Sequence, residues 1–284
     1  MFRGIALKFF FMNKVLKFPL HLAPKLEEKL RQLGLEREEY PNAVFCFRGK
    51  DLQVVFYPTG TFLVQGKGDV KGLIEKLVEN LSVESDYIGT DEAGKGDLFG
   101  PLVVCGFALT PKVAKEVLKL GVRDSKSVPP ESLKEIAQKL MELNCHRCVK
   151  INPYAYNEIY RKLQNLNKIL SLAHAVVIDQ LFLEFGLTKA IVDKFMKGSY
   201  IDCFLNSSLE VIEETNAESH LAVACASILA RYLYLKELER LSKVAGIRLP
   251  AGSGNEAKRI FRELRAKFDG QTLKKLAKLH FKVS

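Results

Sequence analysis

Two adjacent carboxylates, Asp91 and Glu92, stand at the end of a short apolar run and directly before a glycine-rich loop. The loop is Gly-Lys-Gly at 94–96, and an apolar, strand-like segment follows at 102–105. An uncompensated buried carboxylate is costly or becomes protonated, so a pair of them in a strand favours a bound cation. Glycines let backbone N–H groups approach another molecule closely. The pattern indicates a cation site beside a binding loop, and a solvated acidic turn in a hairpin is the alternative.

Residues 89–95 also fit the phosphate-binding loop pattern GxxxxGK, and a strand-like run precedes them. In that pattern the next residue is Ser or Thr, which ligates magnesium, but here it is Gly96. Asp91 and Glu92 would also lie inside a loop that has to hold phosphate anions. These two departures exclude a nucleotide-binding loop.

Two further acids stand where elements of structure are expected to begin or end. Asp193 follows the apolar run 190–192, and binding residues often lie at the carboxyl ends of strands in open sheets. Glu218 precedes a long helical pattern, where an acid would also complement the helix dipole. Each has a structural alternative, a turn cap for Asp193 and dipole compensation for Glu218. Of the nearby histidines, His174 is expected to pack in its helix, while His220 could approach Glu218.

Residues 86–105 closely resemble the first active-site motif of type 2 ribonucleases H, the ribonuclease HII and HIII group. The matching features are an apolar strand, the run DEAGKG and a second strand that contains a proline. Residues 124–126 resemble the family's DSK loop, and 218–231 resemble its acidic residue before a helix rich in Ala, Ser and Ile. The resemblance covers about 86–255. Lys95, Glu218 and an extra domain ahead of the motif favour ribonuclease HIII.

The resemblance implies an endoribonuclease that hydrolyses the RNA strand of RNA/DNA hybrids with two Mg²⁺ or Mn²⁺ ions, leaving 5′-phosphate and 3′-hydroxyl ends. It implies that four carboxylates are both catalytic and metal-binding: Asp91, Glu92, Asp193 and Glu218. It implies five substrate-binding residues: Gly94, Lys95, Gly96, Ser125 and Lys126. The backbone of 94–96 would read the ribose 2′-hydroxyl. The alternative is a non-catalytic nucleic-acid-binding protein.

The charge of the chain is compatible with either function. The formal net charge is +10, and residues 243–284 hold 11 Lys and Arg against 3 Asp and Glu. A basic balance favours polyanions such as nucleic acid. We see no apolar run that approaches the roughly 20 residues of a membrane helix and no convincing signal peptide, so we expect a cytoplasmic protein without a membrane partner.

The N-terminal part, 1–80, is predicted to be a small α+β domain. Helical periodicity covers 24–33 and 70–80, and three short strands are expected at 43–48, 51–57 and 61–66. This pattern resembles the TATA-binding-protein-like domain that precedes the catalytic domain in ribonucleases HIII. We expect it to bind substrate, with lysines near its turns as candidates: Lys50, Lys67 and Lys71. A packing or dimerisation module is the alternative, although a monomer is expected.

Residues 81–86 are the predicted linker, and 87–284 the predicted catalytic domain. There, strands and helices alternate around one core, which predicts a mixed α/β sheet flanked by helices, as in the ribonuclease H fold. The expected strands are 87–90, 98–109, 146–151 and 190–192. The main expected helices are 111–120, 131–143, 166–185 and 219–242.

The chain has six cysteines, and two of them, Cys145 and Cys148, have CxxC spacing. No second cysteine pair is present to complete a zinc site. A thiol redox pair is the alternative to two separate buried or half-exposed thiols, which we favour. We expect no disulfide framework, because the expected compartment is reducing.

Overall fold

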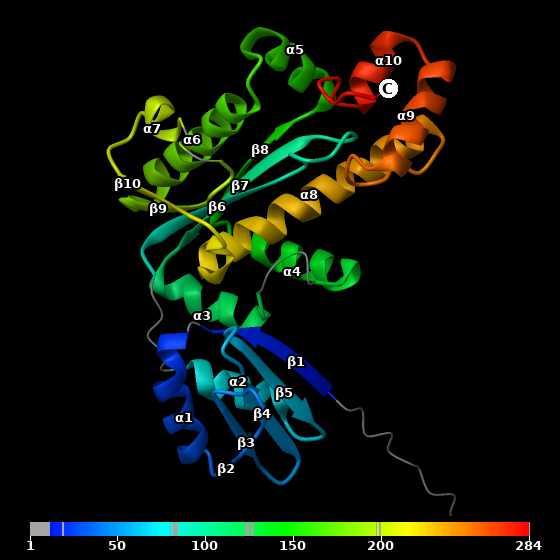
Figure 1. Cartoon of the computed structure of the whole chain (residues 1–284). Coiled ribbons are helices and arrows are strands. Elements are labelled where there is room, and N and C mark those ends of the chain that lie inside the picture. Colours follow the sequence, from blue (N-terminus) through cyan, green and yellow to red (C-terminus); the bar gives the residue numbers. More distant parts are fainter. Residues whose placement is uncertain are drawn as a thin grey trace, which may run out of the picture. The chain divides into compact units, whose positions relative to one another are not determined.

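The computed structural model describes residues 12–18, 20–79, 81, 85–122, 125, 128–196, 198 and 200–283. The chain forms two compact units (Figure 1). The first unit is Met1–Glu84 together with Pro111–Val122, and the second is Ser85–Thr110 together with Arg123–Ser284. Lys126 and residues 82–84 of the predicted linker lie outside the described residues.

The first unit contains an antiparallel sheet with strand order β1-β5-β4-β3-β2. Its strands are β1 Met12–Lys17, β2 Glu36–Glu38, β3 Phe45–Arg48, β4 Leu52–Phe56 and β5 Thr61–Gly66. Side chains of β5 alternate between buried and half-buried, which places Phe62 and Val64 in the core. Phe18, Phe45 and Phe56 pack around Phe62. The predicted α+β class is confirmed, and β1 and β2 add two strands to the three predicted.

The described part of the first unit contains the α-helices α1 Ala23–Gln32, α2 Val70–Val78 and α3 Pro111–Leu120, with a short 3₁₀ helix at Leu20–Leu22. The sequence pattern assigns 111–120 to the second domain, whereas its contacts group α3 with the first unit. Lys14 Nζ donates a hydrogen bond to the Leu120 carbonyl at 3.5 Å, and Lys115 Nζ donates to the Glu79 carbonyl at 3.0 Å. The chain therefore returns to the first unit after it has formed the first strands of the second.

The second unit is built on a mixed sheet with strand order β10-β9-β6-β7-β8, as the predicted α/β class requires. Its strands are β6 Tyr87–Ala93, β7 Leu102–Leu109, β8 His146–Ile151, β9 Lys189–Asp193 and β10 Glu210–Glu214. The β6–β7 and β7–β8 pairs are antiparallel, and the β6–β9 and β9–β10 pairs are parallel. Its helices are α4 Pro130–Glu142, α5 Pro153–Leu163, α6 Leu166–Phe185, α7 Ile201–Phe204, α8 Leu221–Ala245, α9 Asn255–Lys267 and α10 Gly270–Leu276.

Two glycines let helices approach opposite faces of this sheet. A Cβ at Gly89 would lie 2.2 Å from the Val223 nitrogen of α8, so a larger residue would displace backbone. A Cβ at Gly106 would lie 2.5 Å from the Val177 side chain of α6. Gly106 pairs with Thr90, which is one residue from Gly89. Because successive strand residues point to opposite faces, α8 covers one face and α6 the other (Figure 1).

α6 is long and apolar enough to cross a membrane by length and composition alone, with a mean hydropathy of 1.4. Half of that stretch is buried inside the protein, where Leu170, Ala173 and Ile178 belong to the core of the second unit. A core helix passes the same test, and packing explains its composition. No other helix in the described part of the chain meets the test.

The cysteine expectation was wrong in one respect. Cys148 of β8 forms a disulfide with Cys105 of β7, its directly paired neighbour across the two strands. Cys145 is a buried free thiol, so the CxxC spacing does not define a redox pair. The two bonded cysteines are 43 residues apart in the sequence, and only the strand pairing brings them together.

Candidate active site

Eight of the nine predicted site residues line one cavity of about 350 Å³ in the second unit. The lining includes all four predicted carboxylates, residues 94–96 and Ser125. The ninth, Lys126, lies outside the described residues. The cavity stands at the carboxyl ends of β6 and β9, so the sheet brings Asp91 and Asp193 together across 102 positions of sequence.

Asp91 points to the α8 face of the sheet, because it is two residues beyond Gly89. Its side chain is 6% exposed, and its Oδ1 accepts a hydrogen bond from the Glu92 backbone N–H at 2.7 Å. Burial raises the pKa of Asp91 well above its usual range, and the nearby charges of Glu92 and Asp193 raise it further. A hydrogen bond with Ser227 opposes these effects. The site holds more negative charge than its protein neighbours neutralise.

Glu92, the next residue, points toward α6. Its Oε2 is buried without a hydrogen bond and lies 3.4 Å from Nε2 of the fully buried His174. His174 Nδ1 is 2.9 Å from Thr90 Oγ1, and the ring stacks on Phe195 with centroids 4.9 Å apart. His174 therefore packs in its helix as expected and also contacts a predicted catalytic carboxylate. His220, in contrast, pairs with Glu214 at 2.8 Å and is not among the residues that line the cavity.

Asp193 and Glu218 are held by the segment that leads into α8. Asp193 is the last residue of β9, and its Oδ1 accepts from the Ala217 backbone N–H at 3.0 Å. Glu218 lies in the short 3₁₀ helix Ala217–Ser219, and its Oε1 accepts from Ser227 Oγ at 3.2 Å. Ser227 Oγ is also 2.8 Å from Ser125 Oγ. These bonds tie the residues before and on α8 to the end of β9.

The glycine loop, residues 94–96, forms another wall of the cavity. Gly94 has φ +89°, and a Cβ there would lie 2.1 Å from the Pro101 carbonyl oxygen, so only glycine fits. Gly96 is exposed, with no atom within 4 Å of where its Cβ would be. Lys95 Nζ donates to the Phe195 carbonyl at 2.5 Å and lies 3.6 Å from Glu92 Oε1. The backbone of the loop is thus open to a ligand, while the Lys95 ammonium is engaged within the protein.

Three polar α8 residues that the sequence reasoning did not select also line the cavity, together with Leu235: Ser227, Arg231 and Tyr234. They occupy positions i, i+4 and i+7 of α8, which is one face of a helix. The same spacing, counted from the Ala-Ser-Ile motif, could have identified them. Arg231 Nε is buried without a hydrogen bond among the described residues, and the guanidinium is a cation at the edge of an anionic cavity. Asp97 is a further lining residue.

The carboxylates of the cavity are donors that suit a hard divalent cation. Among the described residues, however, no three His, Cys, Asp or Glu side chains are close enough together to form a complete metal site. Mg²⁺ and Mn²⁺ prefer carboxylate oxygens and retain water ligands, so they need only a few protein donors. Asp91 is buried beside two other acids, and Glu92 has a buried oxygen without a hydrogen bond. A bound cation would relieve both features.

Comparison with known proteins places these observations in a family. Residues 88–284 match the family model described as Ribonuclease HII. A protein named Ribonuclease HIII from Protochlamydia amoebophila (strain UWE25) is 35% identical over 279 residues, which cover 93% of this chain and 92% of the relative. Another Ribonuclease HIII, from Aquifex aeolicus (strain VF5), is 33% identical over 243 residues, covering 86% and 91%.

Solved structures are similar to most of the chain. The crystal structure of Bst-RNase HIII in complex with Mn²⁺ superposes with a TM-score of 0.66 at 28% identity, covering 95% of this chain and 96% of that one. The crystal structure of Aquifex aeolicus RNase H3 gives a TM-score of 0.60 at 30% identity, covering 94% and 100%. Both comparisons extend into residues 1–84 of the first unit, which the family model does not cover.

Proposed function

The chain belongs to the ribonuclease HII family, among its ribonuclease HIII members, and on that premise we propose that its metal-binding catalytic residues are Asp91, Glu92, Asp193 and Glu218. The enzyme is a metal-dependent endoribonuclease that hydrolyses the RNA strand of RNA/DNA hybrids and leaves 5′-phosphate and 3′-hydroxyl ends. One observation carries the assignment of residues: all four carboxylates line a single cavity beside the glycine loop.

When bound, two Mg²⁺ or Mn²⁺ ions would supply charge stabilisation for the attacking and departing oxygens of the phosphodiester. Asp91 is the most buried of the four carboxylates, and its raised pKa shows that it lacks a counter-charge within the protein, so it would be a ligand of such an ion. Glu92, Asp193 and Glu218 line the same cavity and would be the other protein ligands. Ser227 donates its hydroxyl proton to Glu218 Oε1 at 3.2 Å and so orients that carboxylate.

The glycine loop is the proposed reader of the ribose 2′-hydroxyl, which distinguishes RNA from DNA. Gly96 is exposed, and nothing in the described chain occupies the space beside it, so a sugar can approach its backbone. The Lys95 ammonium contacts the Phe195 carbonyl and Glu92, so it compensates the charge of Glu92. Substrate recognition by Lys95 is proposed to involve its backbone and not its side chain. Arg231 is the candidate phosphate ligand, because it is a cation that lines the anionic cavity. Ser125 is proposed to position Ser227, because their hydroxyl groups are 2.8 Å apart. The proposed contact of Lys126 with phosphate rests on the resemblance to the family's DSK loop.

The first unit is proposed to bind the hybrid through the open face of its sheet. On β5, Phe62 and Val64 are buried while Gln65 is half-exposed, so Gln65 lies on the face away from the core. Gln65 pairs with Asn13 of β1 and with Gln53 of β4, which gives a row of amide side chains across three strands. Amide groups can hydrogen-bond to sugar and phosphate oxygens without reading base sequence. The enzyme is proposed to act as a monomer, which sedimentation at assay concentration would check.

Asp91→Asn tests the assignment of the catalytic residues. The variant should lose Mg²⁺-dependent cleavage of a labelled hybrid by a factor on the order of 10³ or more, with an unchanged circular dichroism spectrum. Asp202→Asn, which changes an exposed carboxylate on α7, is the matched control and should keep normal activity. Normal turnover in the Asp91 variant would show that the site is wrongly assigned. Hybrid binding by the wild type with Mg²⁺, Mn²⁺ or EDTA, and no cleavage in any of them, would favour a non-catalytic binding protein.

A further inference from the structure

We infer that the C-terminal segment, residues 276–280, holds the glycine loop in the shape that recognises RNA, and that Lys278 is the positioning residue through which it acts. This inference rests on the proposed function of the glycine loop. It concerns a basic residue that is far from the loop in sequence and belongs to none of the family motifs described above.

Lys278 is a fully buried lysine whose ammonium group faces backbone carbonyls. Its Nζ lies 2.7 Å from the Gly100 carbonyl oxygen, 3.4 Å from that of Pro101 and 3.5 Å from that of Phe99. Its N–H groups thus face three consecutive carbonyls, with the shortest contact to Gly100. The charged or titratable groups around it are Asp97, His280 and the Tyr156 ring.

The carbonyls that Lys278 binds support the glycine loop directly. Gly94 packs against the Pro101 carbonyl so closely that an added Cβ would lie 2.1 Å from its oxygen. The Pro101 carbonyl therefore contacts both Lys278 and Gly94. A shift of residues 99–101 would move the surface on which Gly94 rests, and with it the N–H groups of the loop. None of the four catalytic carboxylates is part of this contact.

Backbone pairing aligns the C-terminal segment with residues 98–100. The Lys278 N–H donates to the Leu98 carbonyl at 2.8 Å, and the Gly100 N–H donates to the Leu276 carbonyl at 3.1 Å. Ala277 forms an isolated antiparallel bridge with Phe99. The segment behaves as a short extra strand beside residues 98–100.

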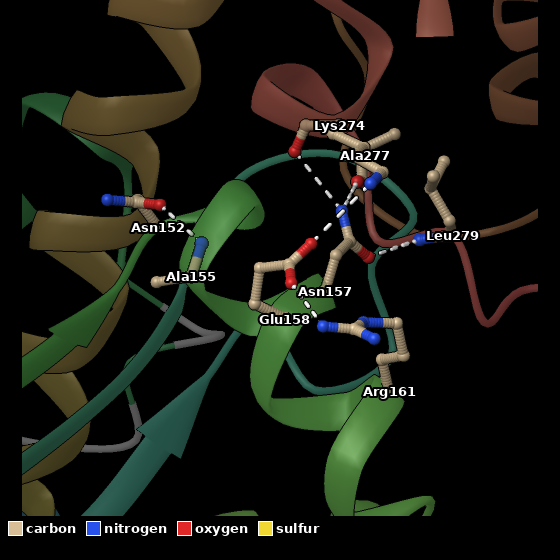
Figure 2. A network of polar contacts seen from close by, with 8 residues as sticks. All are labelled: Asn152, Ala155, Asn157, Glu158, Arg161, Lys274, Ala277 and Leu279. Carbon is tan, nitrogen blue, oxygen red and sulfur yellow. Dashed lines mark hydrogen bonds and ion pairs between the residues drawn. The ribbon is translucent and has the colours of Figure 1, made fainter. Parts of the chain in front are cut away.

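A buried asparagine on α5 fixes the other side of the same segment (Figure 2). Asn157 Nδ2 donates to the Ala277 carbonyl at 2.8 Å and to the Lys274 carbonyl at 3.1 Å. Its Oδ1 accepts from the Leu279 N–H at 2.8 Å. One amide thus satisfies three backbone groups around Lys278, so the lysine backbone has little freedom to move.

Stability alone does not account for a lysine at this position. Burial lowers the pKa of Lys278 to about 7, and the charge of Asp97 offsets this only in part. Burial disfavours the charged form of a lysine, so this residue type is a costly choice for a position that serves packing alone. What the amino group provides in either protonation state, and an apolar side chain does not, is a directional contact with the carbonyls of residues 99–101.

The test compares recognition of RNA/DNA hybrid and of DNA duplex by the full-length enzyme. Steady-state cleavage gives KM for the hybrid, and a DNA duplex of the same sequence, added as competitor, gives its inhibition constant Ki. Lys278→Met should raise KM by about tenfold and leave Ki within about twofold, because only recognition of the ribose is impaired. Lys275→Met removes the same charge from an exposed position three residues away and should leave the ratio of KM to Ki unchanged.

Asn157→Asp provides the second variant, since it keeps the size of the side chain but loses both N–H donors to the C-terminal segment. It should raise the same ratio, even if Lys278→Met does not fold. A wild-type ratio in both variants, an equal rise in KM and Ki, or loss of the fold in both would overturn the inference and leave the segment a purely structural role. If the wild type itself binds hybrid and DNA duplex equally, the proposed function of the loop fails instead.

Discussion

Asp91 and Glu92 are neighbours in the chain, yet they point to opposite faces of the second sheet. Asp91 lies on the α8 side with Ser227, and Glu92 lies on the α6 side with His174. Both side chains still line the cavity, because they lie near the end of β6, at the edge of the sheet where the cavity is. Alternation along one strand thus lets consecutive residues approach a metal centre from different directions.

Asp91→Asn should stabilise the metal-free protein while it abolishes cleavage. The pKa of Asp91 is raised in the folded state, so its contribution to stability is lost as pH rises through that pKa, and the ionised form is destabilising at neutral pH. Removing the charge should raise the free energy of unfolding by about 1 kcal/mol, or Tm by about 2–4 °C. Thermal unfolding in EDTA at pH 7 measures this, and Asp202→Asn should leave Tm unchanged. A lower Tm in the Asp91 variant would contradict it.

Lys278 should make stability rise with pH. Its folded-state pKa is about 7, below the ordinary value of 10.5 that applies when the chain is unfolded. Between those values the unfolded state binds the proton and the folded state does not, so this group adds stability as pH rises from 7. The unfolding free energy of the wild type minus that of Lys278→Met should therefore increase from pH 7 to pH 9. Denaturant titrations measure it, and a constant difference would contradict the prediction, as would the same growth in Lys275→Met.

At the scale of elements, the site depends on how closely α8 approaches β6. The carboxylates of β6 and β9 come from the sheet, whereas Glu218 and Ser227 come from the segment that begins α8. Gly89 allows the two elements to meet at backbone distance. The register of the helix on the strand decides whether Ser227 reaches both Asp91 and Glu218.

Gly89→Ala should therefore damage both stability and activity. The added Cβ would lie 2.2 Å from the Val223 nitrogen and 2.3 Å from the Ala222 carbonyl carbon, so backbone has to move. Overpacking of this kind should cost about 1–3 kcal/mol of unfolding free energy, and displacement of α8 should lower kcat. Gly270→Ala is the matched control, since no atom lies within 4 Å of its added Cβ. Urea unfolding and hybrid cleavage check both variants, and wild-type behaviour of the Gly89 variant would refute the packing argument.

At the scale of the whole molecule, the two units are joined by more than a single linker. Residues 111–122 return to the first unit after β7. A cut at residue 84 would remove the sheet and helices against which α3 packs and would expose its buried residues Ala114, Val117 and Leu118. Point variants in the intact chain are therefore the sounder way to separate binding from chemistry.

Replacing Lys50, Lys67 and Lys71 together by Ala should weaken hybrid binding without changing the chemistry. All three side chains are exposed in the first unit. If they bind phosphates, the variant releases fewer counterions, so KM should rise several-fold and the salt dependence of log KM should become less steep by about 0.9 for each phosphate that is no longer neutralised. Remote binding energy of this kind leaves kcat comparatively intact.

The matched control removes three other exposed lysines, one from each helix of the first unit: Lys25, Lys76 and Lys112. This control lowers the net charge by the same amount and should have the smaller effect on KM and on the salt dependence. Equal effects in the two triple variants would assign the change to net charge, and no effect in either would show that these lysines do not bind the hybrid.

The sequence by itself determined those features of the protein that depend on a continuous stretch of residues. Asp91 and Glu92 stand beside the glycine loop in one stretch, and Glu218 stands directly before its helix motif, so local pattern was enough to select them. The α/β and α+β classes of the two units followed from periodicity in the same way. The edge strands β1, β2 and β10 did not, because short edge strands carry little periodicity and are defined by their partners.

Tertiary structure alone decided the features that depend on contacts between distant residues. Cys105 and Cys148 bond because β7 and β8 pair, and α3 belongs to the first unit because its apolar face packs there. In the sequence, Lys278 is one of 11 basic residues in 243–284, with nothing to separate it from solvated lysines. It becomes a buried contact of residues 99–101 only when the chain end pairs beside them, because burial depends on what the fold brings near a residue and not on its neighbours in sequence.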